Sequence, residues 1–169
     1  MQVTESRLHG VKILKPASAF EDFRGIYLQT YNQKEYREGG VRVKFVQDDV
    51  VVSYKNVLRG IHGDNITWKL VSCLYGRVYA VVVNNDPDSD QFRKWESFVL
   101  SNDNRLQLLV PPRFGNSYLT LSDISLYHYK QSTLYKRDNQ FTLAWNDPAL
   151  GIWWPIKNPI VSMRDEFPK

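Results

Sequence analysis

The chain has 169 residues, of which 43% are hydrophobic and 24% charged, a balance typical of a globular protein with a sizeable core. Its net charge is +4, but the 22 Lys and Arg are scattered without a run of five, so composition gives nucleic-acid binding no support. The single cysteine, Cys73, excludes an internal disulfide, and no apolar stretch reaches membrane-spanning length. A chain of this length is expected to form one domain over residues 1–169. Because residues 1–7 are polar and do not resemble the apolar region of a signal peptide, we expect the protein to be cytoplasmic.

Short β-strands separated by turn residues dominate the predicted secondary structure. In chain order, strands are expected at 10–14, 26–31, 45–54, 57–62, 94–100, 106–110, 117–121 and 124–131. Residues 20–25 are expected to form a turn, and residues 33–38 a short helix ended by Gly39-Gly40. About ten short strands with almost no helix predict an all-β sandwich or barrel.

Two stretches are predicted to form pairs of neighbouring strands. Residues 70–83 are nearly continuously apolar and are expected to fold as a hairpin around Gly76. Residues 117–121 and 124–131 are expected to pair around Ser122-Asp123. On the second of these strands Tyr127 and Tyr129 share one face and His128 points to the other, so His128 is interpreted as a structural histidine.

His62 is the residue that most directly indicates chemistry. It ends the run Val-Leu-Arg-Gly-Ile-His at 57–62, with Arg59 three residues before it and Lys69 on the next apolar run. No second histidine lies nearby, which argues against a metal site. A lone histidine beside fixed cations is better suited to act as a general base on an anionic substrate, although a histidine in a strand is more often structural.

Ten short motifs in collinear order carry a resemblance to a known family. They are DFRG at 22–25, FVQD at 45–48, VLRGIH at 57–62, KLV at 69–71, PP at 111–112, LSD at 121–123, YK at 129–130, WNDP at 145–148, WP at 154–155 and RD at 164–165. Together they resemble the dTDP-4-dehydrorhamnose 3,5-epimerases, which act on nucleotide-linked 4-keto sugars. The resemblance implies a cupin-like jelly roll (a double-stranded β-helix) with short peripheral helices.

The resemblance also implies roles for residues at matching positions. His62 is implied as the general base, Asp165 as the carboxylate that orients it, Tyr129 as the acid on the opposite face of the sugar, and Lys69 as the cation beside the C4 oxygen. Arg24 and Arg59 are implied as diphosphate contacts, and Gln47 as a nucleotide or sugar contact. No metal or redox cofactor is implied, because a C4 ketone already acidifies the hydrogens on C3 and C5. A homodimer is also implied, in which an N-terminal strand joins the partner's sheet.

Three departures from the family pattern bear on the substrate. Asn116 stands where the pattern Pro-Pro-Gly-Phe-Ala-His-Gly-Phe has its histidine, and its amide can hydrogen-bond a sugar hydroxyl or the C4 oxygen. Gln29 stands where the family has an acidic residue after Arg-Gly, a change that affects base or sugar recognition. Gly63-Asp64 replaces an aromatic residue and a glutamine, which is expected to open space beside the base.

These departures resemble a branch of bacterial epimerases that act on GDP-linked 4-keto-heptoses for capsule assembly. The segments concerned are 58–64, 115–117 and 140–147. We therefore favour a GDP-4-keto-heptose over a dTDP-4-keto-6-deoxy-hexose, with inversion at C3 alone or at C3 and C5. The alternatives are a sugar-nucleotide 3,4-ketoisomerase, a catalytically inactive sugar-nucleotide-binding cupin and a metal-dependent cupin. The last needs paired histidines, which the region around His62 lacks.

Overall fold

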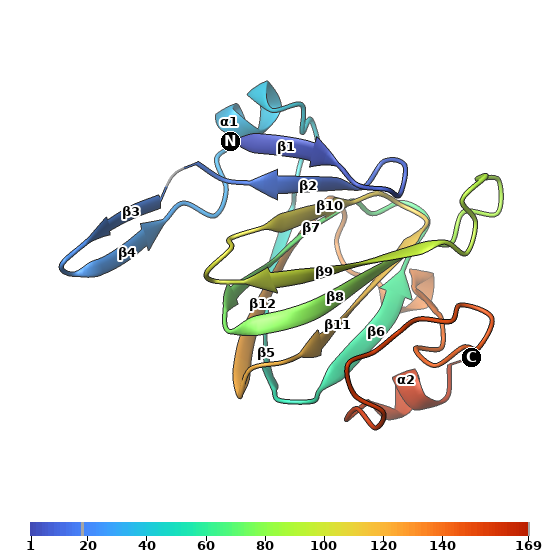
Figure 1. Cartoon of the computed structure of the whole chain (residues 1–169). Helices are drawn as coiled ribbons and strands as arrows, with labels where there is room; N and C mark the ends of the chain where they lie inside the picture. The colour runs from blue at the N-terminus through green and yellow to red at the C-terminus, as the bar shows by residue number, and fades with distance from the viewer. Residues whose placement is uncertain (18, 169) are drawn as a thin grey trace.

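Two β-sheets packed face to face form the body of the molecule in a computed structural model, which describes residues 1–17 and 19–168 (Figure 1). The first sheet has the order β1 (Gln2–Glu5), β2 (Lys12–Lys15), β10 (Gln107–Val110), β7 (Lys69–Tyr75), β12 (Ile124–Gln131) and β5 (Gln47–Tyr54). The second has the order β13 (Phe141–Thr142), β6 (Leu58–Gly63), β11 (Phe114–Thr120), β8 (Arg77–Asn84) and β9 (Trp95–Ser101). The predicted cupin-like jelly roll is confirmed.

From β5 onward the chain alternates between the two sheets, except that β8 and β9 are neighbours in the second sheet. The predicted hairpin over residues 70–83 is therefore wrong, because β7 pairs with β10 and β12 while β8 pairs with β9 and β11. The predicted pairing of 117–121 with 124–131 is wrong for the same reason. A continuous apolar run reports burial on both faces of a strand and does not say which strand lies beside it.

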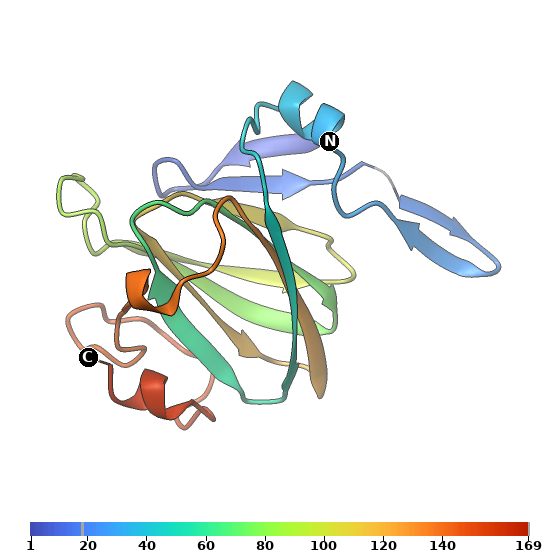
Figure 2. The same ribbon diagram turned by 180° about the vertical axis from the view of Figure 1, so that it is seen from behind.

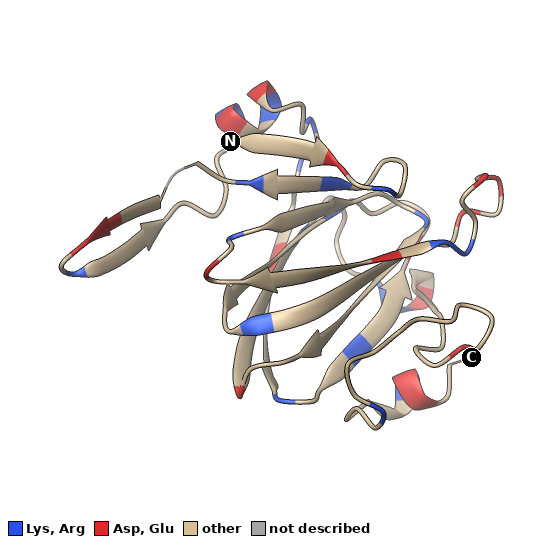
Figure 3. Cartoon of the chain, viewed as in Figure 1, with Lys and Arg blue, Asp and Glu red and all other residues tan. Residues whose placement is uncertain are grey.

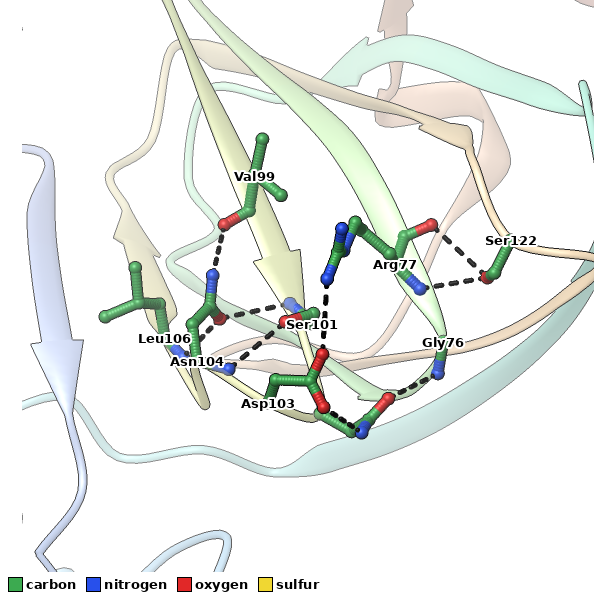
Figure 4. Close-up of polar contacts among 9 residues, drawn as sticks. Gly76, Arg77, Val99, Ser101, Asp103, Asn104, Leu106 and Ser122 are labelled. Atoms are coloured by element: carbon green, nitrogen blue, oxygen red, sulfur yellow. Dashed lines mark hydrogen bonds and ion pairs between the residues drawn. The ribbon is translucent and has the colours of Figure 1, made fainter.

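Tight polar turns carry the chain from one sheet to the other at one end of the sandwich (Figure 4). At the β7–β8 junction Gly76 has φ +78°, and a Cβ atom there would lie 2.2 Å from the carbonyl oxygen of Ile124. The N–H of Gly76 donates to Asn102 Oδ1 at 2.9 Å, and the N–H of Arg77 donates to Ser122 Oγ at 2.9 Å. Glycine is required here because a side chain would collide with the start of β12.

The apolar side chains form three layers. The space between the sheets is filled by side chains such as Val71, Val82 and Leu108, all buried. The outer face of the second sheet is covered by the C-terminal segment, where Leu150 is buried and Trp145 and Trp154 are partly buried. The outer face of the first sheet is covered near β2 by α1 (Gln33–Glu38), whose bounds match the predicted helix and which Asn32 caps.

An arm formed by β3 (Ala19–Asp22) and β4 (Gly25–Leu28) projects away from the body (Figures 1 and 2). The turn predicted at 20–25 is thus a hairpin, in which Asp22 accepts hydrogen bonds from the backbone and side chain of Arg24 and Gly25 has φ +119°. Phe23 is 98% exposed, Phe20 80% and Tyr27 66%, so these three rings have little apolar cover from the described part of the chain.

Charged side chains are scattered over the surface, as the absence of a run of basic residues in the sequence predicts. Lys and Arg are spread over both sheets, the arm and the loops, and they alternate with Asp and Glu (Figure 3). No helix in the described residues is long and apolar enough to cross a membrane. His128 is buried and hydrogen-bonds Asp48 and Ser72, which confirms its interpretation as a structural histidine.

Candidate active site

A cleft opens between the two sheets and encloses about 850 Å³, including its mouth. The first sheet contributes Val51, Lys69, Tyr127, Tyr129 and Gln131, and the second contributes Arg59, His62, Asn116 and Tyr118. The remaining lining residues come from the loop after β12 and from the C-terminal segment: Tyr135, Gln140, Ser162, Arg164 and Asp165. A cleft of this size suits a small-molecule ligand, and its two walls can contact the ligand from opposite sides.

His62 and Asp165 lie 103 residues apart in the chain and form a hydrogen bond of 2.5 Å between Nε2 and Oδ1. Burial alone would raise the pKa of Asp165, but the hydrogen bond and charge of His62 outweigh it, with help from the N–H of Gly60, and the pKa lies below its usual value. An ionised carboxylate at Nε2 holds the ring proton there. The Nδ1 atom of a neutral ring is then free to accept a proton.

Local structure explains how these two side chains meet. Asp165 lies in α2 (Met163–Glu166), whose N-cap Ser162 accepts a hydrogen bond from the Asp165 N–H. Gly60 has φ +115°, and a Cβ atom there would lie 2.8 Å from the carbonyl oxygen of Asn116. Only glycine permits this close approach of β6 to β11, and its N–H also donates to Asp165 Oδ2 at 3.4 Å.

Lys69 lies on the opposite wall and is 7% exposed. Burial lowers its pKa, Asp64 opposes that shift, and Arg164 adds to it. No carboxylate among residues 1–17 and 19–168 forms an ion pair with its ammonium group. A poorly solvated cation without an ion pair is suited to stabilise negative charge on a ligand.

Tyr129 also lies on the first sheet, across the cleft from His62. Burial raises its pKa to about 12, the charge of Asp49 adds to the shift, and Arg59 opposes it. The hydroxyl is therefore protonated at neutral pH and can donate a proton, while Arg59 is the cation that would favour the resulting phenolate. Arg59 is held by a 3.0 Å hydrogen bond from its Nε to Ser53 Oγ.

Comparisons with known proteins show the family to which the chain belongs. The model of the dTDP-4-dehydrorhamnose 3,5-epimerase family matches residues 5–169. The enzyme of that name from Escherichia coli is 39% identical over 171 residues, which cover 98% of this chain and 92% of the relative. The crystal structure of the enzyme of that name from Bacillus anthracis, with TDP and PPi bound, has a TM-score of 0.94 and 35% identity, covering 99% of this chain and 98% of that chain.

The chain belongs to the dTDP-4-dehydrorhamnose 3,5-epimerase family. It is an enzyme of the epimerase class. Membership of this family favours an epimerase over the two alternatives, a ketoisomerase and an inactive binding cupin. A dTDP-4-dehydrorhamnose 3-epimerase from Streptomyces niveus is 30% identical, covering 86% of this chain and 72% of the relative. The names of the relatives thus include both C3 epimerases and C3/C5 epimerases.

Six of the nine residues predicted for the epimerase site line the cleft together: His62, Tyr129, Asp165, Lys69, Arg59 and Asn116. The other three do not. Arg24 is on the exposed arm and pairs with Asp22, and Gln29 lines a separate hollow near Cys73. Gln47 bonds the side chain of Asp49 and the N–H of Tyr135 and lines a third hollow.

The expected opening beside the base is not present. Gly63 is buried, and a Cβ atom there would lie 2.3 Å from the carbonyl oxygen of Phe114 and 2.4 Å from the ring of Phe141. Asp64 is buried, and it accepts hydrogen bonds from the N–H groups of Ile66 and Thr67 and from the side chain of Gln140. The space left by a smaller residue is therefore occupied by β13 and not by solvent.

Several lining residues were not predicted from the sequence. Arg164 belongs to a matched motif, but no role was derived for it; its Nε donates to Thr142 Oγ1 at 3.0 Å. Tyr127 and Tyr135, for which no role in the site was predicted, also line the cleft. For Tyr127 the signal was present, because it shares a strand face with Tyr129.

The ligand sets that hold metal ions in proteins are built largely from His, Cys, Asp and Glu side chains. Among the described residues, no group of three or more His, Cys, Asp or Glu is placed to hold a metal ion. The carboxylate nearest to the base, Asp165, is instead committed to His62 and to the N–H of Gly60. The arrangement is suited to proton transfer by side chains alone.

Proposed function

We propose that the protein inverts C3, or C3 and C5, of a nucleotide-linked 4-keto-6-deoxy sugar by removing and returning a proton on opposite faces of the ring. The observation that carries this proposal is the placement of a carboxylate-held imidazole, His62, and a neutral phenol, Tyr129, on facing walls of one cleft. Inversion needs two proton-transfer groups on opposite sides, and general acid–base groups must lie within reach of the reacting carbon.

In the first half-reaction Nδ1 of His62 removes the hydrogen from C3 as a proton. The electron pair of the broken C–H bond forms the C3–C4 double bond, and the carbonyl π pair moves onto the C4 oxygen. Asp165 stabilises the imidazolium that results. Lys69, which has no ion pair with a carboxylate in the described chain, stabilises the enolate oxygen.

In the second half-reaction the enolate collapses to the ketone while C3 takes the proton of the Tyr129 hydroxyl from the other face. The products are the inverted centre, a phenolate at Tyr129 and an imidazolium at His62. Arg59 favours the phenolate, and a proton passed through solvent restores both groups. The same sequence at C5 would give a double epimerase.

A dTDP-linked 4-keto-6-deoxy-hexose is the first substrate we propose, because the related enzymes are named for dTDP-linked sugars. The sequence motifs had favoured a GDP-linked 4-keto-heptose over this substrate, so the order of the two candidates is reversed. A GDP-linked 4-keto-heptose remains the second candidate. It is favoured by Asn116, which faces His62 across the β6–β11 pair where the family motif has a histidine.

We propose that the enzyme is a homodimer in which the arm reaches a second copy. Phe20, Phe23 and Tyr27 are exposed on the arm, and Val50, Val52 and Tyr54 form an exposed apolar row on β5. Burying such aromatic and apolar side chains against another copy is favourable. Arg24 would then contact the diphosphate in the partner's cleft, since it is absent from its own.

Mixing two inactive variants tests the arm. Arg24→Ala and His62→Asn should each be inactive alone, and dissociating and re-associating them together should restore up to about a quarter of wild-type activity, since half the dimers carry one intact site. Native mass spectrometry, which separates the two variants by mass, verifies that mixed dimers form. If mixed dimers form without any regain of activity, Arg24 does not act in the partner's cleft.

Heavy-water exchange tests the function itself. The protein is incubated in D₂O with dTDP-4-keto-6-deoxy-glucose and, separately, with GDP-4-keto-6-deoxy-heptose, and deuterium in the sugar is read by NMR. We expect faster incorporation at C3 with the dTDP substrate, and label at C5 as well would identify a double epimerase. Faster exchange with the GDP substrate would reverse the order of the two candidates. Absence of label with both would contradict the proposed reaction.

A further inference from the structure

The hydroxyl of Tyr127 is a buried polar group without a partner. The residue is 1% exposed, and its Oη is the one buried side-chain nitrogen or oxygen in residues 1–17 and 19–168 that has no hydrogen-bond partner. Leaving a hydroxyl unsatisfied in a protein interior is unfavourable, whereas phenylalanine fills the same volume without that cost. The packing of the chain therefore does not explain why a tyrosine and not a phenylalanine occupies this position.

The position of Tyr127 suggests that reason. It lies two residues before Tyr129 on the same face of β12 and lines the same cleft. Its ring stacks on Tyr118 with centroids 3.9 Å apart and an interplanar angle of 17°, so the ring is held firmly. The Tyr118 hydroxyl contrasts with it, since it lies 2.9 Å from Ser53 Oγ and is satisfied within the chain.

Asn116 is the polar neighbour on the other wall. It faces His62 in the β6–β11 register and lines the cleft beside Tyr127. Burial raises the pKa of Tyr127 well above its usual value, Tyr118 adds to the shift, and a side-chain approach of Asn116 to the hydroxyl, which does not meet the geometry of a hydrogen bond, opposes it. The phenol stays neutral at any physiological pH, so the two residues offer uncharged hydrogen-bonding groups, which differ from the cations Lys69 and Arg59.

We propose that Tyr127 and Asn116 form a neutral subsite on the floor of the cleft that binds an oxygen of the sugar ring, with the Tyr127 hydroxyl as donor. The inference rests on the proposed function and adds a specificity-determining residue to it. A site built to hydrogen-bond a substrate oxygen discriminates strongly against ligands that lack it, because its own buried polar group is then left unpaired. The stability lost in the free enzyme is recovered when the sugar binds.

Tyr127→Phe tests the subsite, because it removes one oxygen and keeps the stacked ring. Calorimetric titration compares dTDP with dTDP-glucose, a pair that differs only in the sugar. We expect binding of dTDP-glucose to weaken by about tenfold and binding of dTDP to stay within twofold of wild type. In the exchange assay kcat/KM should fall by about ten- to a hundredfold.

Thermal unfolding separates a ligand-binding hydroxyl from a structural one. The Tm of Tyr127→Phe should equal or exceed that of wild type, because an unsatisfied hydroxyl is removed. Tyr118→Phe is the matched control for stability and should lower Tm by a few degrees, because its hydroxyl is already bonded to Ser53. Tyr79→Phe, in the core layer behind the second sheet, controls for loss of a buried phenol far from the cleft and should leave both binding constants unchanged.

Unchanged binding of dTDP-glucose by Tyr127→Phe would overturn the subsite. A lower Tm together with unchanged sugar binding would show that the hydroxyl holds an ordered water only, which also overturns it. Because the titration measures binding and not turnover, the result stands even if the wild-type enzyme shows no exchange. Failure of the subsite is thereby distinguished from failure of the proposed reaction.

Discussion

Replacing His62 with asparagine is expected to lower the rate of deuterium incorporation at every sugar carbon by about a thousandfold, within the range for loss of a general base. The asparagine amide can still donate to Asp165, so the fold should be retained. The rate is measured by NMR in D₂O under saturating substrate. Exchange at the wild-type rate would remove His62 from the role of base.

A second histidine provides the matched control. His128 also has its Nε2 hydrogen-bonded to a carboxylate, Asp48, at 2.7 Å, and its side chain is 10% exposed. It lies on the face of β12 opposite to Tyr127 and Tyr129. His128→Asn should keep the exchange rate within about twofold of wild type if the fold is intact, as measured by Tm. An equal loss in both variants would indicate a general effect on structure.

Replacing Lys69 with methionine is expected to lower kcat by about a hundred- to a thousandfold, because the enolate loses a donor worth about 3 kcal/mol. The free energy of unfolding should stay level or rise, since a buried ammonium without an ion pair to a carboxylate is replaced by an apolar chain of similar length. Single-turnover exchange and urea unfolding measure the two effects. Loss of stability without loss of kcat would make Lys69 a structural cation.

Lys130→Met is the control for this substitution. Lys130 lies on the opposite face of β12, ion-pairs with Asp48 and packs its ammonium 4.9 Å from the ring centroid of Tyr31. Its removal should reduce stability through the lost pair and leave kcat unchanged. The two lysines therefore have opposite expected effects on stability and activity.

The sequence predicted the strands that carry the site better than it predicted their partners. β5, β6 and β12 lie within two residues of the predicted bounds, and the helix at 33–38 is matched. Alternation and turn residues are local properties of the chain, which is why they could be predicted. Strand pairing depends on contacts between distant segments, and the short turn at Gly76 serves a change of sheet as well as it would serve a hairpin.

Most of the site residues that lie in the collinear motifs were predicted from the sequence. The features that depend on contacts between distant segments were not. His62, Lys69 and Tyr129 converge as expected, although Asp165 meets the base only through the fold. Gly63 did not open a space, because Phe141 from a separate strand fills it, and no local pattern reports that contact. Arg24 lies at the tip of the exposed arm and pairs with Asp22, so its contact with a diphosphate rests on the proposed dimer.

The most direct test of the account is stereochemical. In D₂O, Tyr129→Phe is assayed for deuterium at C3 of the remaining substrate and of the inverted product. We predict that His62 continues to exchange the C3 hydrogen with retention, while inversion falls by at least about a hundredfold because the opposite face lacks its acid. Inversion at the wild-type rate would contradict proton delivery by Tyr129. It would also contradict the mechanism in which His62 and Tyr129 act from opposite walls of the cleft.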